Sequence, residues 1–212
     1  FEARDRLGGR AHTTEQGLDL GATWVWDSET HVHRLIAQLG LQTFTPPSEG
    51  LDTYDDGTIQ RGRLPTSSVP ERRLVGGMAS LVRALAEHAG PVRLGTVVER
   101  VERIPGGLAV HLPGEVVNAK AVLAALPPSL AAAMVPEMAE VWARVPVWMG
   151  EVAKCVGIFD GPVWRAQGLS GRAISRLGPM SEVHDLSTPH VSALFGFAMR
   201  GEGLEERVSA QF

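Results

Sequence analysis

The sequence contains one cysteine, Cys155, among its 212 residues. A single thiol cannot form an intrachain disulfide or a cysteine-rich zinc site, which is compatible with a reducing compartment. No apolar stretch reaches the roughly 18 to 20 residues that a bilayer-spanning helix needs, and the polar first residues do not resemble a signal peptide. We therefore expect a cytoplasmic protein with no membrane segment.

The chain also lacks an excess of either charge. Twenty Lys and Arg side chains stand against 24 Asp and Glu, which gives a formal net charge of -4 and an isoelectric point near 6.0. No compact Lys/Arg run is present, so nucleic acid is not an expected partner. His12, His184 and His190 have no carboxylate or cysteine at metal-ligand spacing, and we expect no metal site.

What the sequence does contain is an alternation of helical and extended patterns. Apolar residues recur at helical spacing over 31–40 and again over 76–90, and each pattern ends at a glycine. The segment "YDDGT" predicts a short hairpin. Strands are predicted at 92–101, 108–112 and 120–126, and later in "EVAKCVGIFD" and "HVSALFGFAM". The nearly continuous apolar run at 120–126 is typical of a strand covered on both faces. Together these patterns predict an α/β fold, α+β overall.

The opening stretch "FEARDRLGGR" combines residue types that suit a nucleotide. An acidic residue at the carboxyl end of a strand, here Glu2, can accept hydrogen bonds from ribose hydroxyls. Gly8 and Gly9 would let backbone amides approach a phosphate, and Arg4 and Arg10 could add forked donors. From composition alone, a charged turn with a Gly-Gly hinge explains the same residues more simply.

The order of these residues is more specific than their composition. "EARDRLGGR" matches the ExRxxxGGR pattern that follows the second strand in FAD-dependent oxidoreductases such as monoamine oxidases, polyamine oxidases and carotenoid desaturases. "LDLGATWVW", "GGMASLVRALAEHAG", "VRLGTVVERVE" and "VLAALPPSL" are similar to further segments of the flavin amine oxidases. The resemblance covers most of the chain.

The resemblance implies FAD as the cofactor and assigns residues to its parts. Glu2 and Arg4 would bind the ribose, and Gly8, Gly9 and Arg10 the phosphate region. The backbone near Gly21 and Ala22 would lie beside the flavin, next to Thr23 and Trp24, and Val98 would meet the adenine through its backbone. A large aromatic residue such as Trp24 is otherwise most simply a core or rim residue.

Lys154 separates the hypotheses about function. Read as a strand, "EVAKCVGIFD" places Val152, Lys154 and Val156 on one face, where an ammonium is costly unless it is paired or solvated. In amine oxidases the matching lysine holds a water against the reactive nitrogen of the flavin, so the resemblance implies a catalytic role for Lys154. The alternative is an edge-strand lysine whose ammonium reaches water.

In terms of domains, the resemblance implies a partial FAD-binding Rossmann-like domain and part of a mixed-sheet substrate domain. Residues 1–45 and 75–145 would belong to the FAD-binding domain. Residues 46–74 would form a shortened insertion or linker, and residues 146–212 would belong to the substrate domain.

The activity implied is oxidation of an amine by hydride transfer to flavin, with dioxygen as the acceptor. A desaturase or protoporphyrinogen-oxidase-like flavoenzyme, and a non-catalytic nucleotide-binding remnant, are the alternatives. The sequence leaves open which amine is the substrate and whether the protein forms a homo-oligomer. The resemblance also implies a Gly-rich loop before Glu2 and a C-terminal segment that complete the flavin site. Because the 212 residues contain neither, we expect them alone to bind FAD weakly or not at all, and to be inactive.

Overall fold

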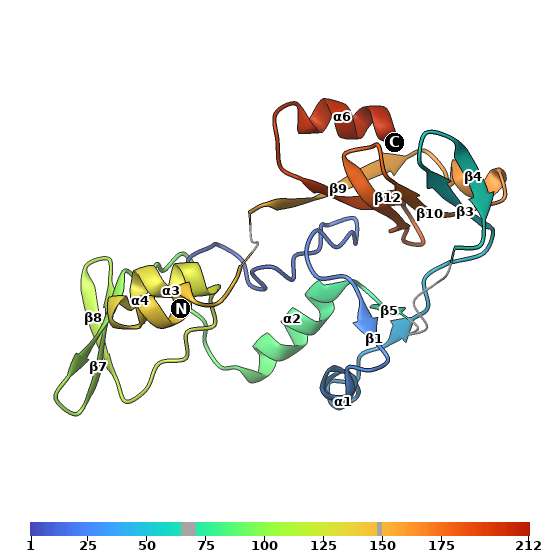
Figure 1. Ribbon diagram of the computed structural model, residues 1–212. Helices are drawn as coiled ribbons and strands as arrows, with labels where there is room; N and C mark the ends of the chain where they lie inside the picture. The colour runs from blue at the N-terminus through green and yellow to red at the C-terminus, as the bar shows by residue number, and fades with distance from the viewer. Residues whose placement is uncertain (65–70, 148–149) are drawn as a thin grey trace. The chain divides into compact units, whose positions relative to one another are not determined.

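The computed structural model of the chain describes residues 1–64, 71–147 and 150–212 (Figure 1). The chain forms two compact units, each built from two stretches of sequence. The first unit comprises Phe1–Gly9 and His88–Met149, and the second comprises Arg10–Glu87 and Gly150–Phe212. Within the described ranges, no helix has the length and apolar character needed to cross a membrane.

The second unit is dominated by a six-stranded sheet. Its strands pair in the order β4 (Ile59–Gly62), β3 (Leu51–Asp55), β10 (Leu169–Ser175), β11 (Met180–Asp185), β12 (Ser192–Met199) and β9 (Val152–Phe159). The pair β3–β10 is parallel and the other four pairs are antiparallel. Strand β9 therefore lies at one edge of this sheet, with β12 as its hydrogen-bonded neighbour.

Alternation along β9 and β12 gives this sheet two different apolar faces. On one face, Ala193 and Phe195 of β12 pack with Leu18, Trp24 and Val156. On the other face, side chains such as Cys155, Leu194 and Ala198 pack with Val208 of helix α6 (Leu204–Gln211), the red helix beside the sheet in Figure 1.

The second unit also contains a small three-stranded sheet with two helices packed on it. The sheet has the order β1 (Val25–Trp26), β5 (Glu71–Leu74) and β2 (Thr43–Phe44). Helix α1 (Thr30–Gln38) and the start of helix α2 (Met78–His88) pack on it through Ile36 and Met78, which meet Val25 and Leu74 in a buried cluster. Helix α5 (Val163–Ala166) is a single turn before β10.

The first unit consists of an antiparallel meander with short helices. Strands β6 (Arg100–Ile104), β7 (Gly107–Leu112) and β8 (Glu115–Ala119) pair in sequence order. Helices α3 (Pro128–Met134), η1 (Pro136–Met138) and α4 (Ala139–Ala143) follow, and Met134 packs against the meander. The first residues of the chain join this unit through backbone hydrogen bonds, including Glu2 N to Arg93 O at 3.0 Å.

Most of the predicted elements are present. The predicted α/β class is confirmed, as are both helices, each followed by a glycine at positive φ, Gly40 at 65° and Gly90 at 73°. The predicted hairpin is the β3–β4 pair, and its turn places Gly57 at a φ of 108°.

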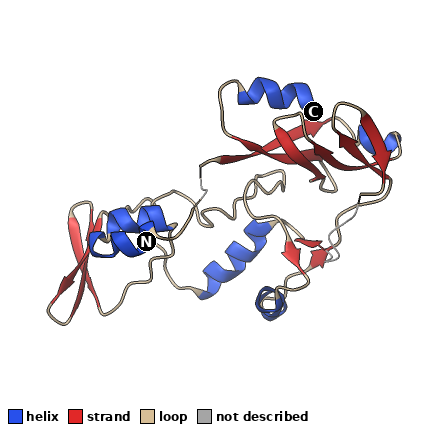
Figure 2. Cartoon of the chain, in the orientation of Figure 1, coloured by secondary structure: helices blue, strands red, loops and turns tan. Residues whose placement is uncertain are grey.

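Two strand predictions were wrong in place or in kind. The strand predicted for 92–101 begins only at Arg100, and the run 120–126 forms no strand (Figure 2). A strand covered on both faces needs hydrogen-bonded neighbours, and among the described strand pairs none includes this run. Its Leu123 is 96% exposed.

The assignment of residue ranges to FAD-binding and substrate domains stays a prediction. Part of the predicted insertion at 46–74, namely residues 65–70, lies outside the described residues. The described remainder of that range supplies strands β3, β4 and β5 of the second unit.

Candidate functional site

The side chain of Lys154 is turned into the second unit. In β9 it lies opposite Phe197 of β12, and its side chain is half-buried. The ammonium nitrogen donates to Gly21 O at 3.2 Å and to Thr23 Oγ1, and it stands 4.1 Å above the centroid of the Phe195 ring. These contacts provide the pairing that a buried ammonium needs.

Burial is also the main influence on the ionisation of Lys154. Removal of the ammonium from water lowers its pKa to about 8, the carboxylate of Asp19 opposes the shift, and the guanidinium of Arg73 adds to it. At neutral pH the ammonium and the free amine are therefore closer in free energy than for an exposed lysine.

The segment that receives Lys154 has a backbone shape that depends on glycine. The amide of Ala22 donates to Arg10 O at 3.1 Å, and a Cβ on Gly21 would collide with that same carbonyl. The hydroxyl of Thr23, which is 4% exposed, donates to Gly21 O at 3.2 Å while it accepts from Lys154. The Lys154 ammonium, the Thr23 hydroxyl and the Gly21 carbonyl thus form a closed set of hydrogen bonds.

Aromatic side chains surround this polar contact. The Trp24 ring lies 5.2 Å from the Phe195 ring, 6.4 Å from Phe197 and 5.6 Å from Trp26, measured between centroids. His184 of β11 is edge-on to Trp24 at 4.9 Å and stacks on Phe195 at 5.3 Å. The structure therefore joins Trp24 to the same cluster as Lys154.

Sequence reasoning missed three ionisable residues near this cluster. Asp19 and Arg73 are almost fully buried, at 0% and 2% exposure. His184 was not expected to bind a metal and received no other role. In the structure, burial lowers its pKa, and Glu182, whose Oε2 lies 3.4 Å from His184 Nε2, opposes this shift. The position of Asp19 between two leucines in "LDLG" was the available signal, because a carboxylate flanked by apolar residues is rarely without a partner.

The predicted cofactor-binding residues and the predicted catalytic Lys154 divide between the two units. Glu2, Arg4, Gly8, Gly9 and Val98 lie in the first unit. Arg10, Gly21, Ala22, Thr23, Trp24 and Lys154 lie in the second. The structure brings Lys154 together with Gly21, Thr23 and, through Phe195, Trp24.

Within the first unit, the opening motif forms a turn that is tied to the segment after α2. Glu2 Oε1 accepts the amide of Arg4 at 2.9 Å, and Arg4 O accepts the amide of Gly95 at 2.8 Å. Gly8 and Gly9 have positive φ values of 93° and 49°, and a Cβ on Gly9 would meet no atom within 4 Å. This open glycine backbone fits the close approach of a phosphate. Val98 packs at the edge of the meander core.

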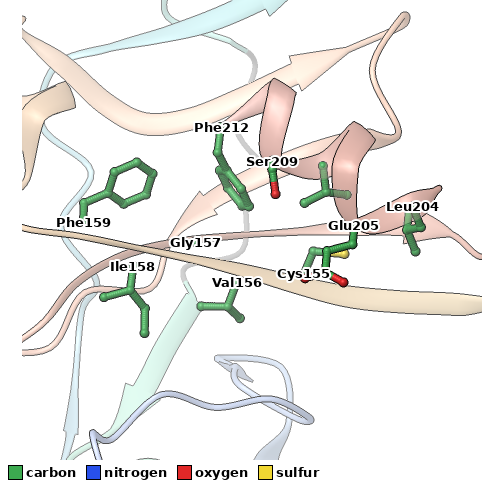
Figure 3. Close-up of a pocket in the computed structure, with 10 residues that line it drawn as sticks. Cys155, Val156, Gly157, Ile158, Phe159, Leu204, Glu205, Ser209 and Phe212 are labelled. Carbon is green, nitrogen blue, oxygen red and sulfur yellow. The ribbon is translucent and has the colours of Figure 1, made fainter.

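A groove of about 600 Å³ lies on the other face of β9, between that strand and α6. Its lining includes Cys155, Gly157, Leu204, Val208 and Phe212. Figure 3 shows Phe212 over the strand, while Val156 and Ile158 point away from the helix. Among the described residues, no group of three or more His, Cys, Asp or Glu side chains could hold a metal ion. The cluster around Lys154, on the opposite face, combines a lysine of lowered pKa with hydrogen-bonding oxygen atoms and an aromatic ring, and it is the candidate site.

Comparison with known proteins identifies a family that matches most of the chain. The family model described as "Flavin containing amine oxidoreductase" matches residues 1–70 and 63–207. The protein named "Probable flavin-containing monoamine oxidase A" from Dictyostelium discoideum is 31% identical over 136 residues, which are 59% of this chain and 29% of that protein. The chain spans about a third of the length of the curated relatives that it matches.

Solved structures share the fold at lower identity. A putrescine oxidase redesigned in its cofactor binding has a TM-score of 0.82 and 20% identity, over 100% of this chain and 70% of that one. Cyclohexylamine oxidase from Brevibacterium oxydans IH-35A has a TM-score of 0.81 and 18% identity, over 99% of this chain and 71% of that one. At these identities the likeness concerns the fold.

Proposed function

The chain belongs to the flavin-containing amine oxidoreductase family, and on that premise we propose that the whole protein oxidises an amine by hydride transfer to FAD, with dioxygen as the final acceptor. The observation that carries this proposal is the buried ammonium of Lys154, held by Gly21 O and Thr23 Oγ1 within an aromatic cluster. The family is one of flavin-containing enzymes, which implies FAD as the cofactor.

Within each unit, the residues present suit the part of such a cofactor that is proposed for them. Gly8 and Gly9, both at positive φ and with open space beside Gly9, would suit the pyrophosphate, and Arg10 would add charge there. Glu2 would accept hydrogen bonds from ribose hydroxyls, with Arg4 beside it. Val98 would meet the adenine, and the segment from Gly21 to Trp24 would border the flavin ring. When bound, FAD supplies the two-electron acceptor for the hydrogen on the amine's α-carbon, and dioxygen restores it with release of peroxide.

Lys154 supplies a positioned donor in this scheme. An ammonium has three N–H donors, and contacts with Gly21 and Thr23 occupy two of them. The third N–H would donate to a water molecule. With a pKa of about 8, the side chain can also give up or regain a proton near neutral pH.

The aromatic cluster and the ammonium together favour an uncharged amine. Trp24 and Phe197 are partly exposed apolar rings packed against the buried Phe195, and the nearby positive charge of Lys154 raises the free energy of a second ammonium. An amine gives up a hydride from its α-carbon only in the neutral form, so the site binds the form that reacts. The imine produced then hydrolyses in water without further help from the protein.

Replacement of Lys154 in the flavin-loaded whole protein tests the proposal. We expect Lys154→Met to slow flavin reduction by amine, or reoxidation by dioxygen, by roughly 100-fold, the scale of a lost proton-transfer group. Anaerobic and aerobic stopped-flow absorbance measures the two steps separately. The matched control is Lys120→Met, which alters an exposed lysine of the first unit.

Two outcomes would contradict the proposal. Unchanged kinetics of both steps in Lys154→Met would favour a desaturase or protoporphyrinogen-oxidase-like flavoenzyme, which has no strict need for the lysine. Absence of bound flavin and of amine-dependent peroxide from the whole protein would favour a non-catalytic nucleotide-binding remnant.

A further inference from the structure

Asp19 is the most deeply buried charged residue beside the candidate site. Its side chain is 0% exposed. Oδ1 accepts the hydroxyl of Thr13 at 2.6 Å and the amide of Met78 at 2.9 Å. Oδ2 is also buried, and no hydrogen-bond partner for it lies among the described residues. A carboxylate removed from water in this way is costly unless a positive charge compensates it.

Two cations interact with this charge, the half-buried ammonium of Lys154 and the buried guanidinium of Arg73. Asp19 stands two and four residues before Gly21 and Thr23, the residues whose oxygen atoms hold the Lys154 ammonium. Its negative charge raises the pKa of Lys154 against the effect of burial, and it acts in the same direction on Arg73. Arg73 donates to Ser187 O at 3.0 Å, and its buried Nε has no partner among the described residues.

A structural role accounts for only half of the Asp19 carboxylate. Oδ1 caps the start of helix α2 through the amide of Met78, and Thr13 Oγ1 accepts the next amide, that of Ala79, at 2.8 Å. Such a cap needs one oxygen acceptor and no charge, because Asn and Ser cap helices about as well as Asp. Capping therefore accounts for the burial of Oδ1, but it does not account for the burial of Oδ2 or of the negative charge.

We propose that Asp19 is a positioning residue for Lys154, with its buried charge holding the ammonium against Gly21 O and Thr23 Oγ1. The interaction between Asp19 and Lys154 does not depend on the proposed function. Only its effect on catalysis rests on that function. Asp19 would keep Lys154 protonated and in place in a site whose burial and aromatic walls favour the neutral amine.

Other charged groups around Lys154 do not take over this role. Arg73 of β5 is a cation, and β11 contributes His184 together with Glu182, whose side chain is 57% exposed and lies 3.4 Å from His184. Strand β12 contributes the uncharged rings of Phe195 and Phe197. Of these groups, Glu182 is the one other acid, and its exposure to water screens its charge.

The small number of lysines makes the coupling directly measurable. The sequence has two, Lys120 and Lys154, and Lys120 is exposed. In the full 212-residue chain labelled with [6-13C]lysine, the Cε signals can be titrated by NMR without flavin or turnover. We expect Lys154 to titrate near pH 8 and, in Asp19→Asn, about one pH unit lower, the scale of a lost opposite charge at short range. The Lys120 titration should be the same in both proteins.

Two further variants separate charge from capping. Thr13→Val removes a capping hydroxyl and keeps the charge, so it should lower the midpoint of urea unfolding but leave the Lys154 titration in place. If Asp19→Asn does not fold, Asp19→Ser offers a second cap without charge and is measured in the same way. A Lys154 titration that is unchanged in a folded, charge-free variant overturns the proposal, and so does an equal downward shift in Thr13→Val.

The flavin-loaded whole protein distinguishes this inference from the proposed function. There, Asp19→Asn should move the lysine-dependent step in the pH profile of flavin reduction to lower pH, and Lys154→Met should remove that step. A shifted NMR titration together with amine-independent flavin chemistry would mean that the charge coupling is correct and the proposed function is wrong.

Discussion

The two faces of strand β9 differ in polarity, although their residues alternate along the same strand. On one face Lys154 hydrogen-bonds to Gly21 and Thr23 and stands above an aromatic ring. On the other face Cys155 packs among apolar side chains beneath helix α6. Because successive side chains of a strand point to opposite sides, one strand can supply a polar site and the packed core behind it.

The comparison shows that burial acts on these two neighbours in opposite directions. Removal from water disfavours the charged form of each group. It therefore lowers the pKa of Lys154, which is charged when protonated, and raises the pKa of Cys155, which is charged when deprotonated. The same physical cause makes the lysine easier to deprotonate and the thiol harder to ionise.

The largest effect that we expect from this difference is a rise of stability with pH that depends on Lys154. Its folded pKa of about 8 lies below the ordinary lysine value of 10.5, so between these two values the unfolded chain binds more protons than the folded chain. The free energy of unfolding should therefore increase with pH across this window, by at most about 3 kcal/mol. Urea unfolding of the wild type and of Lys154→Met at several pH values from about 8 to 10.5 measures this increase.

Cys155 provides the opposing half of the same experiment. Its raised pKa means that the stability it contributes is fully present below the pKa of the unfolded thiol and is lost as pH rises through the folded value. Cys155→Ala should steepen the rise with pH, and Lys154→Met should remove it. If the free energy of unfolding of Lys154→Met rises with pH as steeply as that of the wild type, the assignment of this pH window to the lysine is contradicted.

The next effect concerns packing on the α6 face. Phe212 lies over β9, where a Cβ on Gly157 would meet its ring at 3.0 Å, and it packs with the cluster that contains Val208. Phe212→Ala should lower the free energy of unfolding by about 2 kcal/mol, less than for a fully buried ring because Phe212 is half-buried.

The control for this prediction lies on the same strand. Ile158 is 56% exposed, so Ile158→Ala should change stability by less than about 0.5 kcal/mol. Urea unfolding measures both variants, and the NMR titration of Lys154 should be unaffected by Phe212→Ala. A loss of stability in Ile158→Ala as large as in Phe212→Ala would contradict the prediction, because it would mean that the exposed Ile158 contributes as much packing as Phe212.

The sequence predicted those parts of the molecule that depend on short-range pattern. Alternation in "EVAKCVGIFD" predicted β9 with Lys154 and Cys155 on opposite faces, and glycines marked the ends of both early helices. The run 120–126 shows the limit of such reasoning. Its apolar residues satisfy the pattern of a buried strand, but strand formation also needs a neighbour, which a local pattern does not encode.

The contacts of the ionisable residues in the site could not be predicted for a related reason. Lys154 meets Thr23 across 131 positions of sequence, Asp19 meets Met78 across 59, and Arg73 meets Ser187 across 114. No spacing rule connects residues so far apart, and each looked ordinary alone. Lys154 was singled out because its apolar strand neighbours make an ammonium costly there and because it matches the lysine of the amine oxidases, whereas Arg73 follows another arginine in "ERRL" and resembles a solvated charge.

The smallest effect that we expect isolates the hydrogen bond between Lys154 and Thr23. Thr23→Val keeps the branched shape and removes the hydroxyl that accepts from the ammonium. In a double-mutant cycle with Lys154→Met, the coupling free energy should be about 1.5 kcal/mol, as for hydrogen bonds to charged groups. Thr23→Ser retains the hydroxyl and should retain most of the coupling. A coupling near zero would mean that burial beside Asp19 and Phe195, without Thr23, holds the ammonium on this face of β9.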